Sequence, residues 1–361
     1  MNSMRGGAQQ TDLMANGCTN MSNIGAPWEL DKWLHVDERR CSCAPHSTLA
    51  VKYHLKSGDA VHSSVPMKTC SIPMPRQGLR HLNFSGPAGE APAYPAFEID
   101  GGFYGKDLRK ALGGHRLWID IGANLGTLSV ALALANPTAR GWAFEPNPVT
   151  FAFLERNIQA NGLAHRIEAI NAGITADGRS IYMPRCVLMH PGGSQMASTQ
   201  WSAETGGPAS NNRCFSGSCK HKAEKVRECM RDDPSMVPLK SVALTDALAK
   251  ARGRGGGVRT LGLLKVDCEG CEHEVMEMLE HVRTNGAVSR ITGECHPLNK
   301  LEPSKVARCL KVLRGQECNY GISPWMTCNP PPRAKPRATT SLSKNSLVTK
   351  TRAGWGPHTT G

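Results

Sequence analysis

LWIDIGANLG, residues 117–126, is the segment that indicates the fold most directly. Its first five residues are a short apolar run, the next five form a turn that holds two glycines, and the apolar run of residues 128–135 follows. This succession predicts a buried strand, a tight turn and a helix. We therefore expect a strand–turn–helix unit that begins at about Leu117.

The same alternation continues toward the C-terminus. Short apolar runs predict strands at residues 141–144, 166–172, 261–267 and 290–294, and helical spacing predicts helices at residues 149–160, 242–250, 271–282 and 304–313. A hairpin turn is expected at Asp177-Gly178, before a strand at residues 180–182. Strands that alternate with helices predict an α/β fold of the Rossmann-like type, a mostly parallel sheet with helices on both faces.

Composition divides the chain into three regions. Residues 1–95 are rich in Gly, Pro, Ser, Met and Cys, so we assign them no fold and expect part of them to be disordered. Residues 96–325 hold the α/β domain, within which the pattern dissolves at residues 184–236. For this insertion we favour a flexible, disordered excursion over an acceptor-binding lid or a zinc loop. Residues 326–361 form a basic tail that we expect to be disordered.

The positive charge gathers in that tail. The formal charge of the chain is +13, and residues 329–361 contain six Lys or Arg and no Asp or Glu. A tail of this composition is typical of a solvated, disordered segment, although it also allows contact with RNA or a membrane surface. The expected core shows no basic platform with interleaved aromatic residues, so nucleic-acid binding is possible but not favoured.

The cysteines and the N-terminus bear on the compartment. Among the 14 cysteines, Cys268, Cys271, Cys295 and Cys309 lie in apolar segments, where a free thiol behaves as a small buried hydrophobe, and this favours a reducing compartment. Residues 1–23 are polar, and no run approaches the ~20 apolar residues that a spanning helix needs. We expect a soluble protein without a membrane span and favour the cytoplasm.

Polar residues follow three of the expected strands, at the end of the sheet where α/β folds bind ligands. The first group is the turn, the second is the single carboxylate Glu145, and the third is the stretch of residues 267–270. Glycines let the backbone approach a ligand, and a carboxylate at a strand end can accept hydrogen bonds from both hydroxyls of a ribose. The alternative is that the turn is merely tight and that Glu145 is a surface acid.

A dinucleotide site is the nearest competitor, because Glu145 lies about 20 residues beyond the glycine turn. Alignment of the motif G-x-G-x-x-G on Gly122 puts Asn124 and Thr127 at the second and third glycine positions. Those side chains oppose close packing against a pyrophosphate. A nucleoside without a pyrophosphate therefore fits better.

Residues 117–297 resemble the FkbM-type methyltransferases, which depend on S-adenosyl-L-methionine and mostly methylate hydroxyl oxygens. The resemblance rests on four motifs in order, followed by a glutamate, Glu294, that ends the next strand. The motifs are DIGANLG at 120–126, FEPN at 144–147, RN at 156–157 with NG at 161–162, and LKVDCEGCE at 264–272.

The resemblance implies a class I methyltransferase fold and a cofactor site. Asp120, Gly122 and Asn124 would line the methionine end of the cofactor, and Glu145 would hold the ribose. Asn171 and Ala172 would lie near the adenine. Ala123 and Gly126 complete the cofactor-binding turn.

Catalysis at a hydroxyl acceptor needs a base, because the hydroxyl proton must leave. The candidates are Asp267, Glu269, Glu294 and His296, all expected at strand ends on the ligand side. For Asp267 and Glu269, helix capping and ion pairing, for example with Lys265, are the alternatives to a direct role.

A zinc site is conceivable because two cysteines in C-x-x-C spacing lie near a Cys-His pair. These residues are Cys268, Cys271, Cys295 and His296. Packing explains the cysteines equally well, so we assign no metal.

The sequence thus predicts a methyltransferase that uses S-adenosyl-L-methionine and acts on a small-molecule or glycan-like hydroxyl. The alternatives are an RNA methyltransferase and an inactive binding protein of the same fold.

Overall fold

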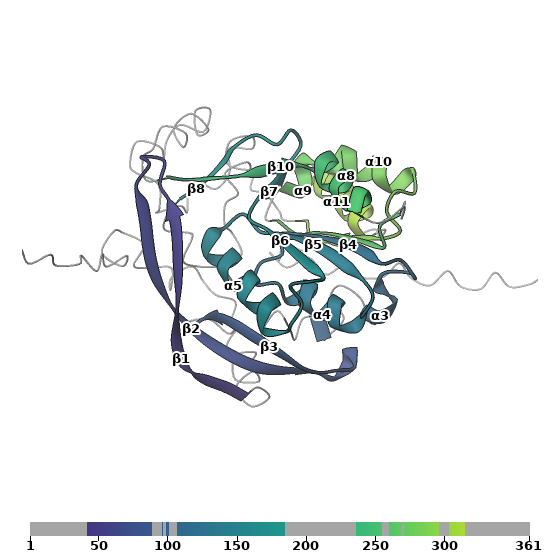
Figure 1. Cartoon of the computed structure of the whole chain (residues 1–361). Coiled ribbons are helices and arrows are strands. Elements are labelled where there is room, and N and C mark those ends of the chain that lie inside the picture. Colours follow the sequence, from purple (N-terminus) through teal and green to yellow (C-terminus); the bar gives the residue numbers. More distant parts are fainter. Residues whose placement is uncertain are drawn as a thin grey trace, which may run out of the picture.

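The computed structural model describes most of the region that carries the motifs (Figure 1). The described residues are 42–88, 96, 99–100, 107–184, 236–254, 260–268, 271–295 and 303–314. The expected tail and almost all of the expected insertion lie outside them.

A sheet of five parallel strands forms the centre of the molecule, in the order β12-β11-β4-β5-β6. The chain runs from β4 outward through β5 to β6, and then returns to β11 on the other side of β4. The strand order therefore reverses between β4 and β11, which is the switch point where such sheets bind ligands. The strands are β4 (Leu117–Ile121), β5 (Arg140–Phe144), β6 (Ile167–Ile170), β11 (Leu263–Val266) and β12 (Ile291–Gly293).

Helices cover both faces of this sheet, and the alternation of side chains along the strands explains why (Figure 1). In β4, Ile119 and Ile121 belong to the hydrophobic cluster under the later helices, whereas Trp118 belongs to the cluster under the earlier ones. The first face carries α3 (Leu108–Ala111), α4 (Thr127–Ala135) and α5 (Pro148–Ala160); the second carries α8 (Leu244–Arg254), α9 (Cys271–Glu274), α10 (Met276–Thr284) and α11 (Pro303–Arg314). The predicted Rossmann-like α/β fold is confirmed.

A three-stranded antiparallel sheet precedes the α/β unit, in a region where the sequence pattern predicts no particular fold. It consists of β1 (Ser42–His54), β2 (Ala60–Met74) and β3 (Leu79–Pro87), with a 3-10 turn, η2 (Pro75–Gln77), between the last two. Cys43 and Cys70 lie opposite each other on β1 and β2 and form a disulfide. Pro66 and Pro73 make β2 difficult to predict from the sequence, since proline is rare inside strands. Pro73 lies where the register between β2 and β3 shifts.

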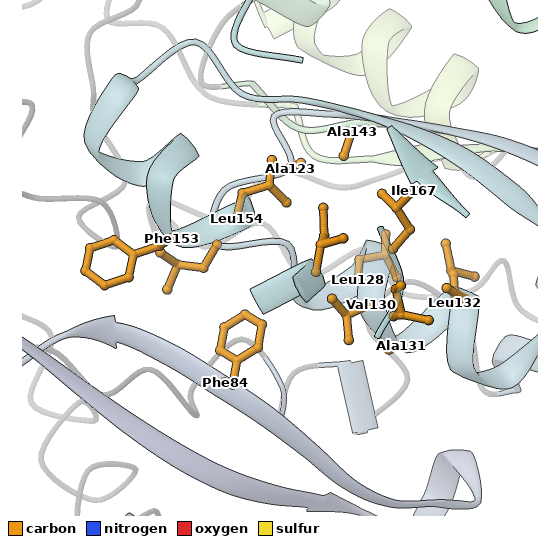
Figure 2. Close-up of a cluster of buried hydrophobic side chains, with 14 of the residues drawn as sticks. Phe84, Ala123, Leu128, Val130, Ala131, Leu132, Ala143, Phe153, Leu154 and Ile167 are labelled. Atoms are coloured by element: carbon orange, nitrogen blue, oxygen red, sulfur yellow. The ribbon is translucent and has the colours of Figure 1, made fainter. Parts of the chain in front are cut away.

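The antiparallel sheet and the α/β unit share one hydrophobic core. β3 contacts both α4 and α5, and Phe84 of β3 is fully buried. Figure 2 shows Phe84 among side chains of the two helices, including Phe153, Leu154 and Leu128. The sheet is therefore part of the packed structure that supports the central sheet.

The hairpin predicted at Asp177-Gly178 is wrong. The strand before that turn, β7 (Gly173–Thr175), pairs in parallel with β10 (Ser241–Ala243), and the strand after it, β8 (Ile181–Pro184), pairs with β9 (Met236–Leu239). Both partners come from the far side of residues 185–235. The chain does bend at this point, but each of the two strands pairs with a strand distant in the sequence and not with the other.

Some element boundaries also differ from the prediction. The helix expected at residues 271–282 is divided into α9 and α10 at Val275, whose ψ of 10° departs from helical geometry. Residues 241–243 form a strand, so α8 begins at Leu244. The third expected strand ends at Ile170.

The expectation of free thiols is also wrong. Cys268 bonds to Cys271, and Cys295, two residues after β12, bonds to Cys309 of α11, which packs beside that strand. Spacing along the chain does not reveal that two cysteines come within bonding reach. With these pairs formed, the cysteines give no support to a reducing compartment. Among the described helices, none is both long and apolar enough to cross a membrane.

Candidate functional site

The glycine turn lies at the switch point, directly against the end of β11. Gly122 has a φ of +71°, and a Cβ atom added to it would lie 1.8 Å from the carbonyl oxygen of Asp267. Only glycine fits this approach. The fold thus brings together the turn after β4 and the acidic segment after β11, which are more than 140 residues apart in sequence.

Glu145 follows β5 and reaches into the same turn. Its Oε2 accepts a hydrogen bond from the Asn124 backbone N–H at 2.9 Å, and its Oε1 accepts one from the Asn147 N–H at 2.9 Å. The side chain is buried, and this burial raises the pKa of the Glu145 carboxyl to about 7 in spite of the two N–H donors and the positive charge of Lys265. Each oxygen keeps a further lone pair for a ligand hydroxyl.

Asn124, a residue of the turn itself, provides a second polar group at the site. Its φ of +52° is in the left-handed region, which asparagine tolerates better than most residues. Its side-chain Oδ1 is buried and has no hydrogen-bond donor among the residues that the structure describes. Such an acceptor fits a site in which a ligand supplies the donor.

Lys265 of β11 joins the site to the interior of the protein. Its Nζ lies 3.2 Å from Asp120 Oδ1 and 3.7 Å from Asp267 Oδ2, and it donates a hydrogen bond to the Gly122 carbonyl at 2.6 Å. Burial alone would lower the pKa of the Lys265 ammonium, but the charges of Asp120 and Asp267 outweigh it and hold that pKa above its ordinary value. The sequence allows an ion pair of Lys265 with Asp267, but nothing in it indicates the pair with Asp120, which lies on another strand.

Asp120 is fully enclosed by protein. Ser129 of α4 donates a hydrogen bond to its Oδ2 at 2.8 Å, and Lys265 pairs with its Oδ1. Its carboxylate thus reaches the glycine turn through Lys265, which holds the Gly122 carbonyl.

The candidate bases are only partly within the described chain. Asp267 is half-buried beyond β11, and Glu294 is half-buried beyond the neighbouring strand β12. Their charges both act on Lys265, which places them around one ammonium group. Glu269 and His296 lie outside the described residues.

Two asparagines hold the strand ends and turns of the site. Asn171, after β6, donates hydrogen bonds from Nδ2 to the carbonyls of Glu145 and Pro146 at 2.8 and 3.1 Å. Asn157 of α5 donates from Nδ2 to the Leu125 carbonyl in the glycine turn at 2.9 Å. Asn157 belongs to one of the sequence motifs, but its structural role could not be predicted because its partners are distant in the chain.

The site carries a clear excess of carboxylates. Among the described residues, the Lys265 Nζ lies 3.2 Å from Asp120 and 3.7 Å from Asp267, and its charge also interacts with those of Glu145 and Glu294. These acids are Asp120, Glu145, Asp267 and Glu294. An environment of this kind favours a cationic ligand and opposes a pyrophosphate.

The zinc set considered in the sequence is not brought together as such. The sulfur atoms of Cys268 and Cys271 form one disulfide, that of Cys295 forms another with Cys309, and His296 lies outside the described residues.

Comparison with known proteins finds two curated relatives, although no family model matches the chain. Methyltransferase sdnD of Sordaria araneosa is 26% identical over 165 residues, which are 44% of this chain and 58% of that protein. The 31-O-demethyl-FK506 methyltransferase FkbM of Streptomyces tacrolimicus is 26% identical over 200 residues, which are 54% of this chain and 70% of that protein. The match thus spans little more than half the length of the first relative.

Solved structures align only over short segments. The mitomycin 7-O-methyltransferase MmcR is 27% identical over 17% of this chain and 19% of its own, with a TM-score of 0.15. The S-adenosylmethionine-dependent methyltransferase SibL is 21% identical over 24% of this chain and 25% of its own, with a TM-score of 0.21. Overlaps this small add nothing to the argument from topology.

Sheet order, switch point and glycine turn define a Rossmann-like fold of the class I methyltransferase type. Within that class, the chain is similar to the FkbM-type methyltransferases, since one of its curated relatives is FkbM itself.

Proposed function

We propose that this protein is an S-adenosyl-L-methionine-dependent methyltransferase that methylates a hydroxyl oxygen of a small-molecule or glycan-like acceptor. The observation that carries the proposal is the contact between Glu145 and the glycine turn at the switch point. Both curated relatives are named methyltransferases, which supports methyl transfer, and the name of one, a 31-O-demethyl-FK506 methyltransferase, supports an oxygen acceptor.

The residues present fit this cofactor. Glu145 offers two carboxylate oxygens to the two ribose hydroxyls, and the buried Asn124 Oδ1 offers an acceptor to a donor of the ligand. The sulfonium and ammonium groups of S-adenosyl-L-methionine suit the surrounding carboxylates. When bound, the cofactor supplies an electrophilic methyl group.

The protein then has to orient the acceptor, exclude water and take up a proton. Asp267 and Glu294 are the described carboxylates at the ligand edge that could accept the hydroxyl proton. Lys265, anchored by Asp120, positions the Asp267 carboxylate and the Gly122 carbonyl. A small displacement of the Asp267 carboxylate or of the Gly122 carbonyl would misalign the acceptor and the cofactor, and in-line transfer depends strongly on their geometry.

Binding is tested first by calorimetric titration of the protein with S-adenosyl-L-methionine. We expect binding in the wild type and its loss, or at least an approximately tenfold weakening, in Glu145→Ala, because the ribose then loses two charge-assisted hydrogen bonds. Glu155→Ala, an exposed change on α5, is the matched control and should bind as the wild type does. A folded wild type that does not bind would contradict the proposal.

Methyl transfer is tested with methyl-labelled cofactor and a panel of hydroxylated small molecules, oligosaccharides and RNA. Label on the oxygen of a small molecule or sugar supports the proposal, whereas label confined to RNA would favour the RNA methyltransferase. With an acceptor in hand, Asp267→Asn and Glu294→Gln identify the base by the loss of kcat, which we expect to be about 100-fold or more. Cofactor binding without transfer to any acceptor would indicate a binding protein of this fold.

A further inference from the structure

A cluster of potential metal ligands lies just beyond β11, next to the glycine turn. The Cys268 Sγ, the Cys271 Sγ and a carboxylate oxygen of Glu272 all lie within 4.8 Å of one another. Cys268 belongs to the turn after β11, and the other two residues begin α9. The two sulfur atoms are bonded to each other, and Glu272 directly follows Cys271 at the start of α9, so the three groups lie close together.

Two of the three groups are closed off from solvent, and Cys268 is half-buried. Cys271 is 2% exposed and Glu272 is fully buried. A buried carboxylate is costly unless its charge is compensated by donors or cations. Two of the three potential ligands are therefore already desolvated at this point of the fold.

The contact between Glu272 and Cys268 is informative about the redox state of the cluster. The Glu272 Oε2 lies 3.2 Å from the Cys268 Sγ. A sulfur in the Cys268–Cys271 disulfide carries no proton and cannot donate to the carboxylate, whereas a thiol can. The carboxylate thus gains a favourable partner at this sulfur only when the disulfide is reduced.

We propose that the reduced cluster of Cys268, Cys271 and Glu272 binds a thiophilic divalent cation of the zinc class. Two thiolates and one carboxylate carry three negative charges, which a dication largely neutralises, and two cysteines with two residues between them are a usual zinc spacing. Zinc accepts both thiolate and carboxylate ligands in a tetrahedral arrangement, and the fourth position is open to water or a nearby side chain. His273, whose Nε2 lies 4.0 Å from Glu272 Oε1, borders the site.

Disulfide formation and metal binding exclude each other. A dithiol reductant breaks the Cys268–Cys271 bond by giving two electrons and two protons, which yields two thiols while the reductant becomes a disulfide. Binding of the dication then releases the two protons. The reverse sequence, with a small-molecule disulfide as oxidant, expels the metal.

The site adjoins the proposed cofactor turn but does not depend on it. A Cβ added to Gly122 would lie 3.1 Å from the Cys268 Cα, so the segment that holds the cluster is also the wall of the turn. Metal binding can be measured without cofactor or acceptor. Failure of one proposal therefore leaves the other standing.

The experiment is a zinc titration of the reduced, metal-free full-length chain against a chromophoric chelator, beside a cobalt titration read by its thiolate charge-transfer absorption. We expect the Cys268→Ser/Cys271→Ser double variant to lose one equivalent of bound metal relative to the wild type. Glu272→Gln should weaken that equivalent by at least about tenfold, since even changes outside the ligand shell cost that much. The Cys295→Ser/Cys309→Ser variant, which lacks another disulfide of α9's neighbourhood, should keep it.

A second measurement needs no substitution. Zinc added to the reduced wild type should protect Cys268 and Cys271 from alkylation, as mapped by mass spectrometry of the peptides, and prior oxidation should abolish zinc binding at these residues. Equal metal content in the wild type and the Cys268→Ser/Cys271→Ser variant, or no protection of the two thiols, would overturn the proposal. Unchanged affinity in Glu272→Gln would overturn the three-ligand site.

Discussion

At the scale of single residues, Glu145 combines two properties that rarely occur together: a buried carboxyl and an expected role in holding polar hydroxyls. Its pKa is raised to about 7 from an ordinary 4.5, so it favours the folded state below about pH 4.5 and loses that contribution as the pH rises through about 7. Ribose hydroxyls donate to the ionised carboxylate, so cofactor binding has the opposite dependence on pH.

We therefore predict that affinity for S-adenosyl-L-methionine falls about tenfold between pH 8 and pH 6, because a carboxyl with a pKa of about 7 must then lose a proton to bind. Calorimetric titration at a series of pH values measures this fall. Glu145→Gln cannot titrate and should retain only the dependence that comes from the cofactor's own amino group. Identical slopes in the two proteins would remove Glu145 from the ribose site.

A second prediction concerns the buried ion pair. Lys265→Met leaves the Asp120 carboxylate buried without its cation, and we expect the free energy of unfolding to fall by about 3–5 kcal/mol. Urea denaturation followed by circular dichroism measures the change. The double variant Asp120→Asn/Lys265→Met should recover at least about 1 kcal/mol relative to the sum of the single changes, since the pair is coupled. Additive effects would mean that the two charges do not stabilise each other.

At the scale of elements, helix α5 ties the N-terminal sheet to the glycine turn. The Asn157 Oδ1 accepts a hydrogen bond from the Ser85 N–H at 2.7 Å, while its Nδ2 donates to the carbonyls of Ser85 and Leu125. One helix turn later, Asn161 makes a similar pair of bonds with Asn83. The helix thus offers the edge of β3 the hydrogen bonds that a neighbouring strand would give.

We predict that Asn157→Ala lowers the free energy of unfolding by about 2–4 kcal/mol, because buried groups of Ser85 and Leu125 lose their partners. Asn161→Ala removes bonds that are open to water and should cost less than about 1 kcal/mol. Chemical denaturation of both variants gives the comparison. Equal losses in the free energy of unfolding would show that burial does not increase the contribution of the Asn157 hydrogen bonds to stability.

Elements with a strong local pattern were predictable, and those defined by distant partners were not. Apolar runs and helical spacing identified β4, β5, β11, α4 and α5 because each is buried on one or both faces. The partners of β7 and β8 come from beyond residue 235, so the predicted hairpin failed. The break between α9 and α10 at Val275 was not predictable either, because no glycine or proline lies at that position.

At the scale of the whole molecule, the antiparallel sheet and the α/β unit should unfold together, because their side chains form one core. We predict that Phe84→Ala lowers the free energy of unfolding by about 3–5 kcal/mol and keeps a single transition. Circular dichroism and tryptophan fluorescence should report the same midpoint in urea. His81→Ala, an exposed change in the same strand, is the control and should have little effect. Two separate transitions would show that the sheet is an independent unit.

The α/β class, the glycine turn and the resemblance to FkbM-type methyltransferases follow from the sequence, because they depend on short-range patterns of polarity, spacing and glycine. The sequence placed Gly122, Glu145 and Asp267 at strand ends on one side of the sheet. The folded chain was needed to establish that Gly122 abuts Asp267, that Lys265 joins Asp120 to the turn, and which cysteines pair. The physical reason is that these contacts join strands and helices far apart in the chain, so packing of the sheet and not local propensity selects the partners.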